Sequence, residues 1–336
     1  MYYILTIAIP TFNRASCVIN RLRELLPQCS SSEIEILIVD NASDDNVEQY
    51  VSRAIPEASA RVKFHRNRAN IGLAANICRC YELSQGKWIW TLGDDDAVCS
   101  GAVASILNVL REEDEKSHIG SFNFSTGIHQ YAQRYDYSTI EAYWAELNSA
   151  YSFSNSLFIS SCIVRTSLVL SNLRVAYQQI FSAAPQIAVV IAGLKCGYTA
   201  VLIPTKIVEW TPPARESQWN LISVIAGLPV LAEIHGSSDA ARQNLYNGIS
   251  LLLPTSYFRT GIKSILLDKY YDTAYWEVYF MRLCSVVSGI TRLKTIMLCT
   301  LSRICWKHPK IHKFFAMLIL KYTKTRPDNS IGLNRL

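Results

Sequence analysis

The sequence predicts an α/β fold, with a mostly parallel sheet flanked by helices and a C-terminal helical extension. Strand-like and helix-like segments alternate over the first hundred residues, which is typical of a parallel sheet with helices on both faces. A charge asymmetry marks the extension, because residues 245–336 hold 14 Lys or Arg and 4 Asp or Glu, while the rest of the chain sums to −4. Such an asymmetry indicates two regions with different surroundings.

Four strands are expected in the N-terminal part, at 4–10, 33–40, 61–67 and 87–93, because these runs are apolar and rich in β-branched or aromatic residues. Helices are expected between them, at 16–28, 46–55 and 73–86. In the first of these helices Val18, Leu22 and Leu25 recur at helical spacing. Gly86 is a stop signal for the third helix.

The composition argues against several classes of protein. No apolar run reaches 18 residues, so no transmembrane helix is expected, and the N-terminal segment lacks the basic start of a targeting peptide. Ten cysteines without a CxxC motif indicate reduced thiols in a cytosolic protein. The absence of GxGxxG and GxxxxGK(S/T) argues against dinucleotide and P-loop sites. The acidic N-terminal region argues against nucleic-acid binding.

Polar side chains follow each of the four expected strands. In chain order they are Thr11 and Asn13, Asp40 and Asn41, Asn70, and the run Asp94, Asp95 and Asp96. Because ligands of open α/β sheets bind beyond the carboxyl ends of the strands, we expect these residues to form one site. Aspartates are common in solvated turns. The convergence of four strand ends instead favours a site for a hard cation such as Mg²⁺ or Mn²⁺, which prefers oxygen ligands.

Three ordered stretches resemble the nucleotide-sugar half of family 2 glycosyltransferases, which have the GT-A fold: IPTFNR at 9–14, IVDNASDD at 38–45 and NIGLAANICRCYELSQGKWIWTLGDDD at 70–96. The resemblance covers residues 3–125 strongly and continues more weakly to about 210. It implies a nucleoside diphosphate sugar as donor, with Asp40 at the position that contacts the nucleobase. The residues that it places at the nucleotide are Pro10, Thr11, Asn13, Arg14, Asp40, Asn41, Ser43, Asp44, Asn70, Gly72 and Asp94.

The aspartate run resembles the DxD motif of that family, whose metal ion, Mn²⁺ or Mg²⁺, clamps the diphosphate. In the usual D-x-D-D register Gly93 takes the first position, Asp95 is the metal ligand and Asp96 takes the fourth position. The pair Asp94-x-Asp96 is a second register. The resemblance therefore implies Asp95 as the principal metal ligand, with Asp94 or Asp96 assisting.

One position departs from the family pattern. Inverting members carry a Glu-Asp pair at the start of a helix that ends in Gly-Tyr, and this Asp deprotonates the acceptor hydroxyl. The Gly-Tyr matches Gly197 and Tyr198, which puts Pro185 and Gln186 where the pair should be. An amide cannot take a proton, so the catalytic base and the anomeric outcome stay open. Other candidates for the base are His129, Asp136, Glu141, Glu209 and Glu216.

The favoured function is metal-dependent transfer of a sugar from a nucleotide sugar to a carbohydrate acceptor, such as a lipid-linked oligosaccharide. More narrowly, the chain resembles bacterial O-antigen and capsule transferases of the abequosyltransferase type. Two alternatives stay open: a sugar-1-phosphate nucleotidyltransferase, whose early GxGxR loop is absent, and an inactive membrane-associated assembly subunit. We expect a GT-A domain at 1–240, with a nucleotide-sugar half at 1–125 and an acceptor half at 126–240, and a basic amphipathic helical region at 241–336.

The C-terminal region has the composition of helices that lie on a membrane surface. Residues 278–326 contain ten Lys or Arg and no Asp or Glu, interleaved with apolar residues. Basic helices with an apolar face lie in the plane of the lipid headgroups. We therefore expect a cytoplasmic protein that binds the anionic inner face of the cell membrane. Ordinary packing of these helices on the catalytic domain is the alternative.

Overall fold

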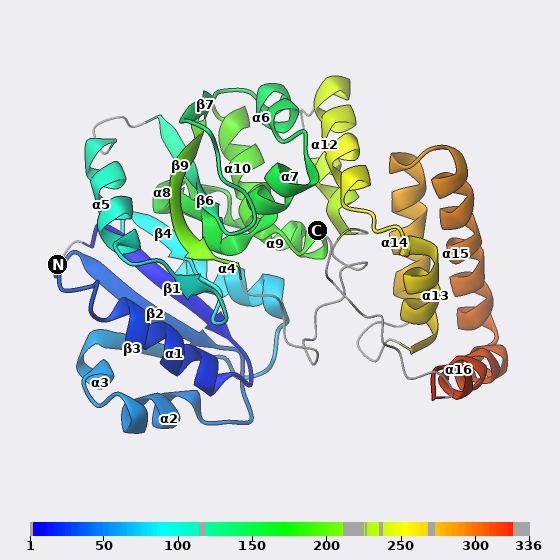
Figure 1. Ribbon diagram of the computed structural model, residues 1–336, viewed down its shortest axis with the longest axis horizontal. Helices are drawn as coiled ribbons and strands as arrows, with labels where there is room; N and C mark the ends of the chain where they lie inside the picture. Colours follow the sequence, from blue (N-terminus) through cyan, green and yellow to red (C-terminus); the bar gives the residue numbers. More distant parts are fainter. Residues whose placement is uncertain are drawn as a thin grey trace.

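The computed structural model describes residues 3–113, 118–210, 225, 227–234, 238–267 and 273–324. It confirms the predicted α/β architecture with a helical C-terminal region (Figure 1). Helices flank a twisted sheet, and the last helices of the chain, coloured yellow to red in Figure 1, form a group beside it.

Nine strands within the described residues form one sheet. They are β1 (Leu5–Thr11), β2 (Ile34–Asp40), β3 (Val62–Arg66), β4 (Trp88–Thr91), β5 (Ala97–Val98), β6 (Ile119–Thr126), β7 (Tyr135–Tyr137), β8 (Cys162–Arg165) and β9 (Thr199–Glu209). The strand order is β3-β2-β1-β4-β8-β6-β9-β5, and β7 pairs with β9. The four expected strands, β1 to β4, are confirmed and pair in parallel, whereas β8 is antiparallel to both of its neighbours.

The helices of the part that carries the sheet are α1 (Ala15–Leu25), α2 (Val47–Ala54), α3 (Ala58–Arg61), α4 (Leu73–Leu83), α5 (Ala102–Glu112), α6 (Ile140–Glu146), α7 (Ala150–Leu157), α8 (Thr166–Ser171), α9 (Leu173–Gln178) and α10 (Pro185–Lys195), with the 3-10 turns η1 (Ile159–Ser161) and η2 (Ile180–Ser182). The C-terminal part contains η3 (Leu228–Glu233), α12 (Asp239–Leu251), α13 (Tyr257–Leu267), α14 (Thr273–Val286), α15 (Gly289–Lys307) and α16 (Pro309–Lys324). Helices α1, α2 and α4 confirm the three helices expected between the first four strands.

The parallel register brings the carboxyl ends of the first strands to one edge of the sheet. Thr11 at the end of β1 lies opposite Asp40 at the end of β2, and Asp40 lies opposite Arg66 at the end of β3. The polar loops that follow the parallel strands β1 to β4 are therefore neighbours in space, although Thr11 and Asp94, which share a hydrogen bond, are 83 residues apart in the chain.

Alternate residues of the central strands face opposite sides of the sheet, as the period of two requires. In β1, Ile7 and Ile9 pack into a core that includes residues of α1, α2 and α5. Ala8 packs into a second core on the other face, with residues of α4 and α10. Both faces are covered, which explains why these strands read as continuous apolar runs.

The C-terminal helices share this second core. Trp276, Phe280 and Leu283 of α14 and Leu298 of α15 are fully buried in it. Part of the stretch expected on a membrane therefore packs against the protein, because α14 lies against α12 and η3. No helix within the described ranges is both long enough and apolar enough to cross a bilayer. The domain boundary at 240 stays a prediction.

Candidate active site

Asp94, in the loop after β4, is at the centre of the candidate active site. Its carboxylate is buried, with 4% of the residue exposed. Thr11 Oγ1 donates to Asp94 Oδ2 at 2.6 Å, and Arg14 Nη1 donates to Asp94 Oδ1 at 3.1 Å. Burial raises the pKa of Asp94 to about 6, while the charge of Arg14 and the hydrogen bond from Thr11 oppose the rise. The site therefore holds a carboxylate that needs a nearby cation to stay ionised.

Asp95, the predicted principal metal ligand, is the more accessible carboxylate, with 39% of its side chain exposed. Its Oδ2 accepts a hydrogen bond from the same Nη1 of Arg14 at 2.9 Å, so one nitrogen bridges both aspartates. Burial alone would lower the pKa of Arg14, but the charges of Asp94 and Asp95 together raise it. The three side chains thus form one charged cluster at the edge of the sheet.

Asp96 points into the protein, away from Arg14. Ser160 Oγ donates to Asp96 Oδ2 at 2.6 Å, and the same hydroxyl accepts from Gly93 N at 2.8 Å. Burial raises the pKa of Asp96 to about 7, against the effect of the Ser160 hydrogen bond. A Cβ atom at Gly93 would lie 2.3 Å from Asp96 Oδ2. The inward position of Asp96 therefore requires glycine at the first position of the aspartate motif.

The loop after β2 is joined to the loop after β1 by polar contacts. Asn13 N donates to Ser43 Oγ at 2.8 Å, and Ser43 N donates to Asp40 Oδ1 at 3.0 Å. Arg66 pairs with Asp40 Oδ2 and donates through Nη2 to Ser43 O at 2.7 Å. Asn13 has a positive φ of 56°, which Asn tolerates, and its side chain bonds the backbone and carboxylate of Asp44. Two loops and the end of β3 are thereby held together.

A network of asparagine side chains links β2 to the start of α4. Asn41 Nδ2 donates to Asn70 Oδ1 at 2.8 Å, and Gly72 N donates to the same oxygen at 2.9 Å. The buried Asn67 side chain donates to both Asn41 and Asn76. Gly72 precedes α4 with a φ of +84°, a backbone conformation that favours glycine. The network gives the loop before α4 a defined shape.

The aspartate cluster with its partners, the joined loops after β1 and β2, and the asparagine network together contain every residue predicted at the nucleotide and metal sites except Pro10. Pro10 lies in β1, beyond Ala8, the last β1 residue that pairs with β4. Ala8 O faces the β4 side, where it accepts from Leu92 N, and Pro10 faces the same side by the alternation of the strand. The missing N–H of Pro10 therefore leaves no strand partner unsatisfied.

Four residues of the groups were not predicted: Arg66, Asn67, Asn76 and Ser160. Arg66 and Asn67 stand at a strand end, so the signal used for the other loops would have found them. Asn76 is a polar residue on the apolar face of α4, which is a weaker signal. Ser160 is 64 residues from Asp96 in the chain and carries no local signal.

The position of the family's proton acceptor is occupied by Gln186, at the start of α10. This helix begins at Pro185, and Gly197 and Tyr198 follow its end, as the motif predicts. Gln186 is 1% exposed, and its Nε2 donates to Leu157 O at 2.7 Å. Its Oε1 is buried without a hydrogen-bond partner among the described residues. The side chain is packed as part of the core and has no proton-accepting group.

Three of the other candidates for the base have local partners. Asp136 pairs with Arg134, Glu209 pairs with Lys206, and Glu141 accepts a hydrogen bond from Ser238. Burial lowers the pKa of His129. Glu216 lies outside the described residues. No candidate for the base is singled out by its contacts.

Asp94 and Asp95 have the chemistry of a site for Mg²⁺ or Mn²⁺. Among the residues that the structure describes, no group of three or more His, Cys, Asp or Glu side chains could hold a metal ion by itself. Mg²⁺ is commonly bound by one or two carboxylates together with substrate phosphates, however, and Mn²⁺ takes similar oxygen ligands. Two neighbouring carboxylates on one loop fit that kind of ion.

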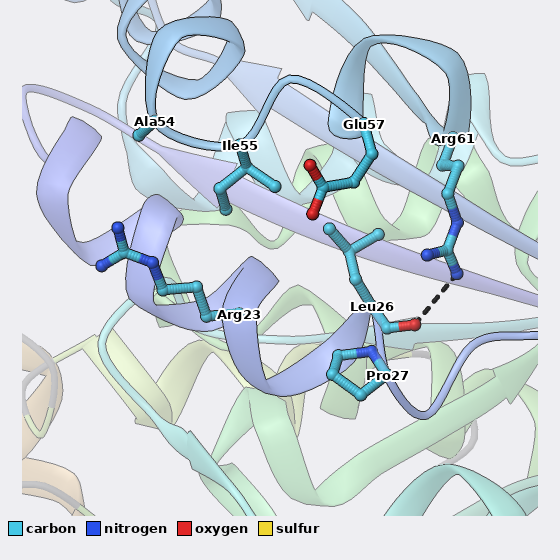
Figure 2. A pocket seen from close by; sticks show the side chains of 7 residues that line it. All are labelled: Arg23, Leu26, Pro27, Ala54, Ile55, Glu57 and Arg61. Atoms are coloured by element: carbon cyan, nitrogen blue, oxygen red, sulfur yellow. Dashed lines mark hydrogen bonds between the residues drawn. The ribbon is translucent and has the colours of Figure 1, made fainter.

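A small pocket lies far from this cluster, at the amino ends of the strands. Figure 2 shows Arg23, Leu26, Glu57 and Arg61 among the side chains that line it. Arg61 Nη2 donates to Leu26 O at 2.9 Å and to Cys29 O at 2.7 Å, so its charge lies at the C-terminal end of α1, where a cation is favourable. The arginine thus has a structural role that accounts for its place.

Comparison with protein families matches residues 6–164 to the family described as glycosyl transferase family 2. The chain is 30% identical over 112 residues to abequosyltransferase RfbV of Salmonella typhimurium, an alignment that covers 32% of each chain. The alignments span about a third of the length of the curated relatives.

Solved structures share the fold over almost the whole chain. S. aureus TarS 1-349, in complex with UDP-GlcNAc, aligns with a TM-score of 0.57 and 15% identity over 92% of both chains. Mannosyltransferase PcManGT from Pyrobaculum calidifontis, in complex with GDP-Man and Mn²⁺, aligns with a TM-score of 0.53 and 13% identity over 94% of this chain and 84% of that chain. The GT-A fold implied by the sequence motifs is therefore confirmed.

The contact between Gly93 and Asp96 generates a prediction for stability. Gly93→Ala should destabilise the fold by about 1–3 kcal/mol, because the added methyl group displaces the Asp96 carboxylate from Ser160. In a double-mutant cycle measured by urea unfolding, Asp96→Ala should cost less in the Gly93→Ala background than in the wild type. Additive effects of the two substitutions would contradict this account of the glycine.

Proposed function

We propose, from the match of residues 6–164 to the model of glycosyl transferase family 2, that the protein transfers a sugar from a nucleoside diphosphate sugar to a carbohydrate acceptor. The observation that carries the proposal is the cluster of Thr11, Arg14, Asp94 and Asp95 at the convergent strand ends. An arginine beside a pair of carboxylates provides both a donor for phosphate oxygens and ligands for a divalent cation.

The donor half of the site is supported by the fold and by the polar loops. TarS, which shares the fold, has been solved in complex with UDP-GlcNAc. Here hydrogen bonds between the loops after β1 and β2 and the start of α4 fix a polar surface that includes the Asp40 carboxylate, against which a nucleotide would lie. Asp40 accepts from Ser43 and pairs with Arg66, which has 54% of its side chain exposed. A base would reach Asp40 Oδ2 by displacing this exposed arginine.

We propose that the transfer depends on Mn²⁺ or Mg²⁺ held by Asp95 with Asp94. Asp96 is 5% exposed and its Oδ2 is bonded to Ser160, so we place it behind the other two. Such an ion, when bound, neutralises the diphosphate and stabilises it as a leaving group. Thr11 holds the Asp94 carboxylate in position for this role, and Arg14 faces the same space. PcManGT, which has the same fold, has been solved with GDP-Man and Mn²⁺.

The acceptor that we propose is a surface polysaccharide precursor, such as a lipid-linked oligosaccharide of O-antigen synthesis. The similarity to an abequosyltransferase supports this choice. The glycosyltransferase family match favours transfer of a sugar over a sugar-1-phosphate nucleotidyltransferase. Gln186 favours a second candidate, an inactive assembly subunit, because the base of inverting members is missing at that position. Hydrolysis of the donor by the purified protein would separate the two candidates.

We also propose that the C-terminal helices bind the protein to the anionic inner face of the cell membrane. In α15 and α16 many large apolar side chains are exposed, among them Ile290, Leu293, Met297, Trp306, Phe314, Phe315, Met317 and Leu318. The surrounding charges within 278–326 are all basic. Each Lys or Arg near an anionic surface contributes about 1 kcal/mol. Apolar side chains with one sign of charge around them suit a headgroup layer better than a protein partner of mixed charge.

The position of these helices fits an acceptor carried by a lipid. Helices α13 to α16 lie on the side of the molecule toward which the carboxyl ends of β1 and β2 point (Figure 1). A membrane bound there would lie on the same side as the candidate active site. This arrangement would bring a membrane-embedded acceptor toward the donor.

Metal coupling through Asp95 is the first prediction from this function. Asp95→Asn should abolish turnover and weaken the Mn²⁺-dependent part of nucleotide binding, because the amide loses the charge that attracts the ion. A thermal-shift screen of UDP, GDP, CDP and dTDP with and without Mn²⁺ measures that binding. Asp239→Asn, at a carboxylate 95% exposed on α12, is the matched control. Full activity of Asp95→Asn, or of the wild type in excess EDTA, would contradict the proposed metal dependence.

Recognition of the nucleobase by Asp40 is the second prediction. Asp40→Ala should raise the donor KM by about 10- to 100-fold, since a hydrogen bond to a charged group is worth about 1.5–3 kcal/mol. It should also flatten the preference among the four nucleotides, because discrimination is lost when a polar partner is removed. The KM for each donor measures both effects. An unchanged preference profile would place base recognition elsewhere.

Membrane binding is the third prediction, and liposome flotation tests it. The wild type should float with anionic vesicles, should not float with neutral ones, and should be released by high salt. Lys310→Glu with Lys313→Glu on α16 should abolish flotation, while Arg53→Glu with Lys195→Glu, which changes the net charge equally at exposed sites of the catalytic half, should not. Equal flotation with neutral and anionic vesicles would refute the electrostatic basis.

A further inference from the structure

Arg14 holds its two aspartates in an unusual way. One nitrogen, Nη1, bridges Asp94 Oδ1 and Asp95 Oδ2, at 3.1 and 2.9 Å. Neither Nε nor Nη2 of Arg14 donates to any residue in the described part of the chain. Arginine often binds a carboxylate with two parallel hydrogen bonds from two nitrogens, which is not the case here. The N–H of Nε and the two N–H groups of Nη2, three of the five donors of Arg14, are therefore uncommitted. The side chain is 30% exposed and can reach solvent.

Arg66, on the same edge of the sheet, provides a contrast. It uses two nitrogens, Nη1 for Asp40 and Nη2 for Ser43 O. That contact ties the arginine to the backbone as well as to a charge. Arg14, by contrast, donates only to the two aspartates among the described residues. Another cation that bound these carboxylates would therefore displace it.

The bridging guanidinium covers the oxygens that a divalent ion would need. Asp94 Oδ2 already accepts from Thr11, so Oδ1 is the Asp94 oxygen left for an ion, and Arg14 is bonded to it. Asp95 Oδ2 accepts from the same nitrogen, Arg14 Nη1. A guanidinium and a divalent ion cannot both lie between these two carboxylates.

From this geometry we propose that Arg14 is an exchangeable internal counter-ion, which competes with the divalent cation for Asp94 and Asp95 and is drawn away by the diphosphate of the donor. The inference rests on the proposed function and adds a regulation of its site. Arginine binds phosphate with its planar fork, so a diphosphate offers the uncommitted donors of Arg14 a better partner than one shared nitrogen. Cation and diphosphate then favour each other's binding, and the coupling is reciprocal.

The test measures Mn²⁺ binding to the nucleotide-free protein, by the electron paramagnetic resonance signal of free Mn²⁺. Arg14→Met removes the competing charge and keeps the size of the side chain, so it should tighten Mn²⁺ binding about tenfold, a typical coupling between two sites. Arg14→Lys retains a cation and should bind Mn²⁺ with an affinity closer to that of the wild type. Arg111→Met, which removes an arginine paired with Glu33 outside the candidate site, should leave the Mn²⁺ affinity unchanged.

A second arm adds UDP, GDP, CDP or dTDP, whichever stabilises the protein in a thermal-shift screen, and corrects for Mn²⁺ bound by the free nucleotide. In the wild type the nucleotide should tighten Mn²⁺ binding more than it does in Arg14→Met, because only the wild type has an arginine to release. Thermal unfolding checks that each variant is folded.

Three outcomes would overturn the inference. Equal Mn²⁺ affinity of wild type and Arg14→Met would show that Arg14 does not compete with the ion, and the proposal of a metal-dependent transferase would still stand. Tightening in Arg14→Lys equal to that in Arg14→Met would show that the positive charge is not the cause. Failure of every variant to bind Mn²⁺, with or without nucleotide, would reject the metal site and the inference together.

Discussion

The buried charge of Asp94 is the constraint on which the site depends. A carboxylate removed from water costs several kcal/mol unless it is paired and hydrogen-bonded. Its partners here are Thr11 at the end of β1 and Arg14 immediately before α1. These contacts exist only because β1 and β4 are parallel neighbours, which puts their carboxyl ends together. The strand order, the start of α1 and the loop after β4 are therefore linked through a single charged side chain.

The loops around Asp94 achieve a defined shape without regular secondary structure. Side-chain amides and hydroxyls satisfy backbone N–H groups that a loop would otherwise leave to water, as Ser43 does for Asn13 and Asn41 does for Ile71. The central strands beneath them are buried on both faces. A ligand site of this kind is preorganised by hydrogen bonds between loops, so little ordering is needed when a ligand binds.

The C-terminal helices divide their apolar residues between two environments. The face of α14 that carries Trp276 and Phe280 is part of the second core, whereas the large side chains of α16, such as Phe314 and Met317, are exposed. The sequence of each helix shows a periodic apolar pattern, which indicates only that one face of the helix avoids water. The pattern does not distinguish a face in the protein core from a face on the surface. The charges around α15 and α16 are basic, and our proposal of binding to an anionic surface rests on them together with this exposed face.

The sequence by itself determined the parallel strands, the helices between them and the polar residues at the strand ends. These follow from local patterns of two and 3.6 residues, and from the rule that parallel strands end at one edge. The ordered motifs resemble the same family whose model matches residues 6–164. Only the tertiary structure decided which aspartate faces inward. Asp94, Asp95 and Asp96 are chemically identical, and their roles differ because Ser160, from a distant turn, reaches one of them while Arg14 reaches the other two. The tertiary structure likewise separated α14 from α16, because burial depends on which surface a helix meets and not on its own pattern.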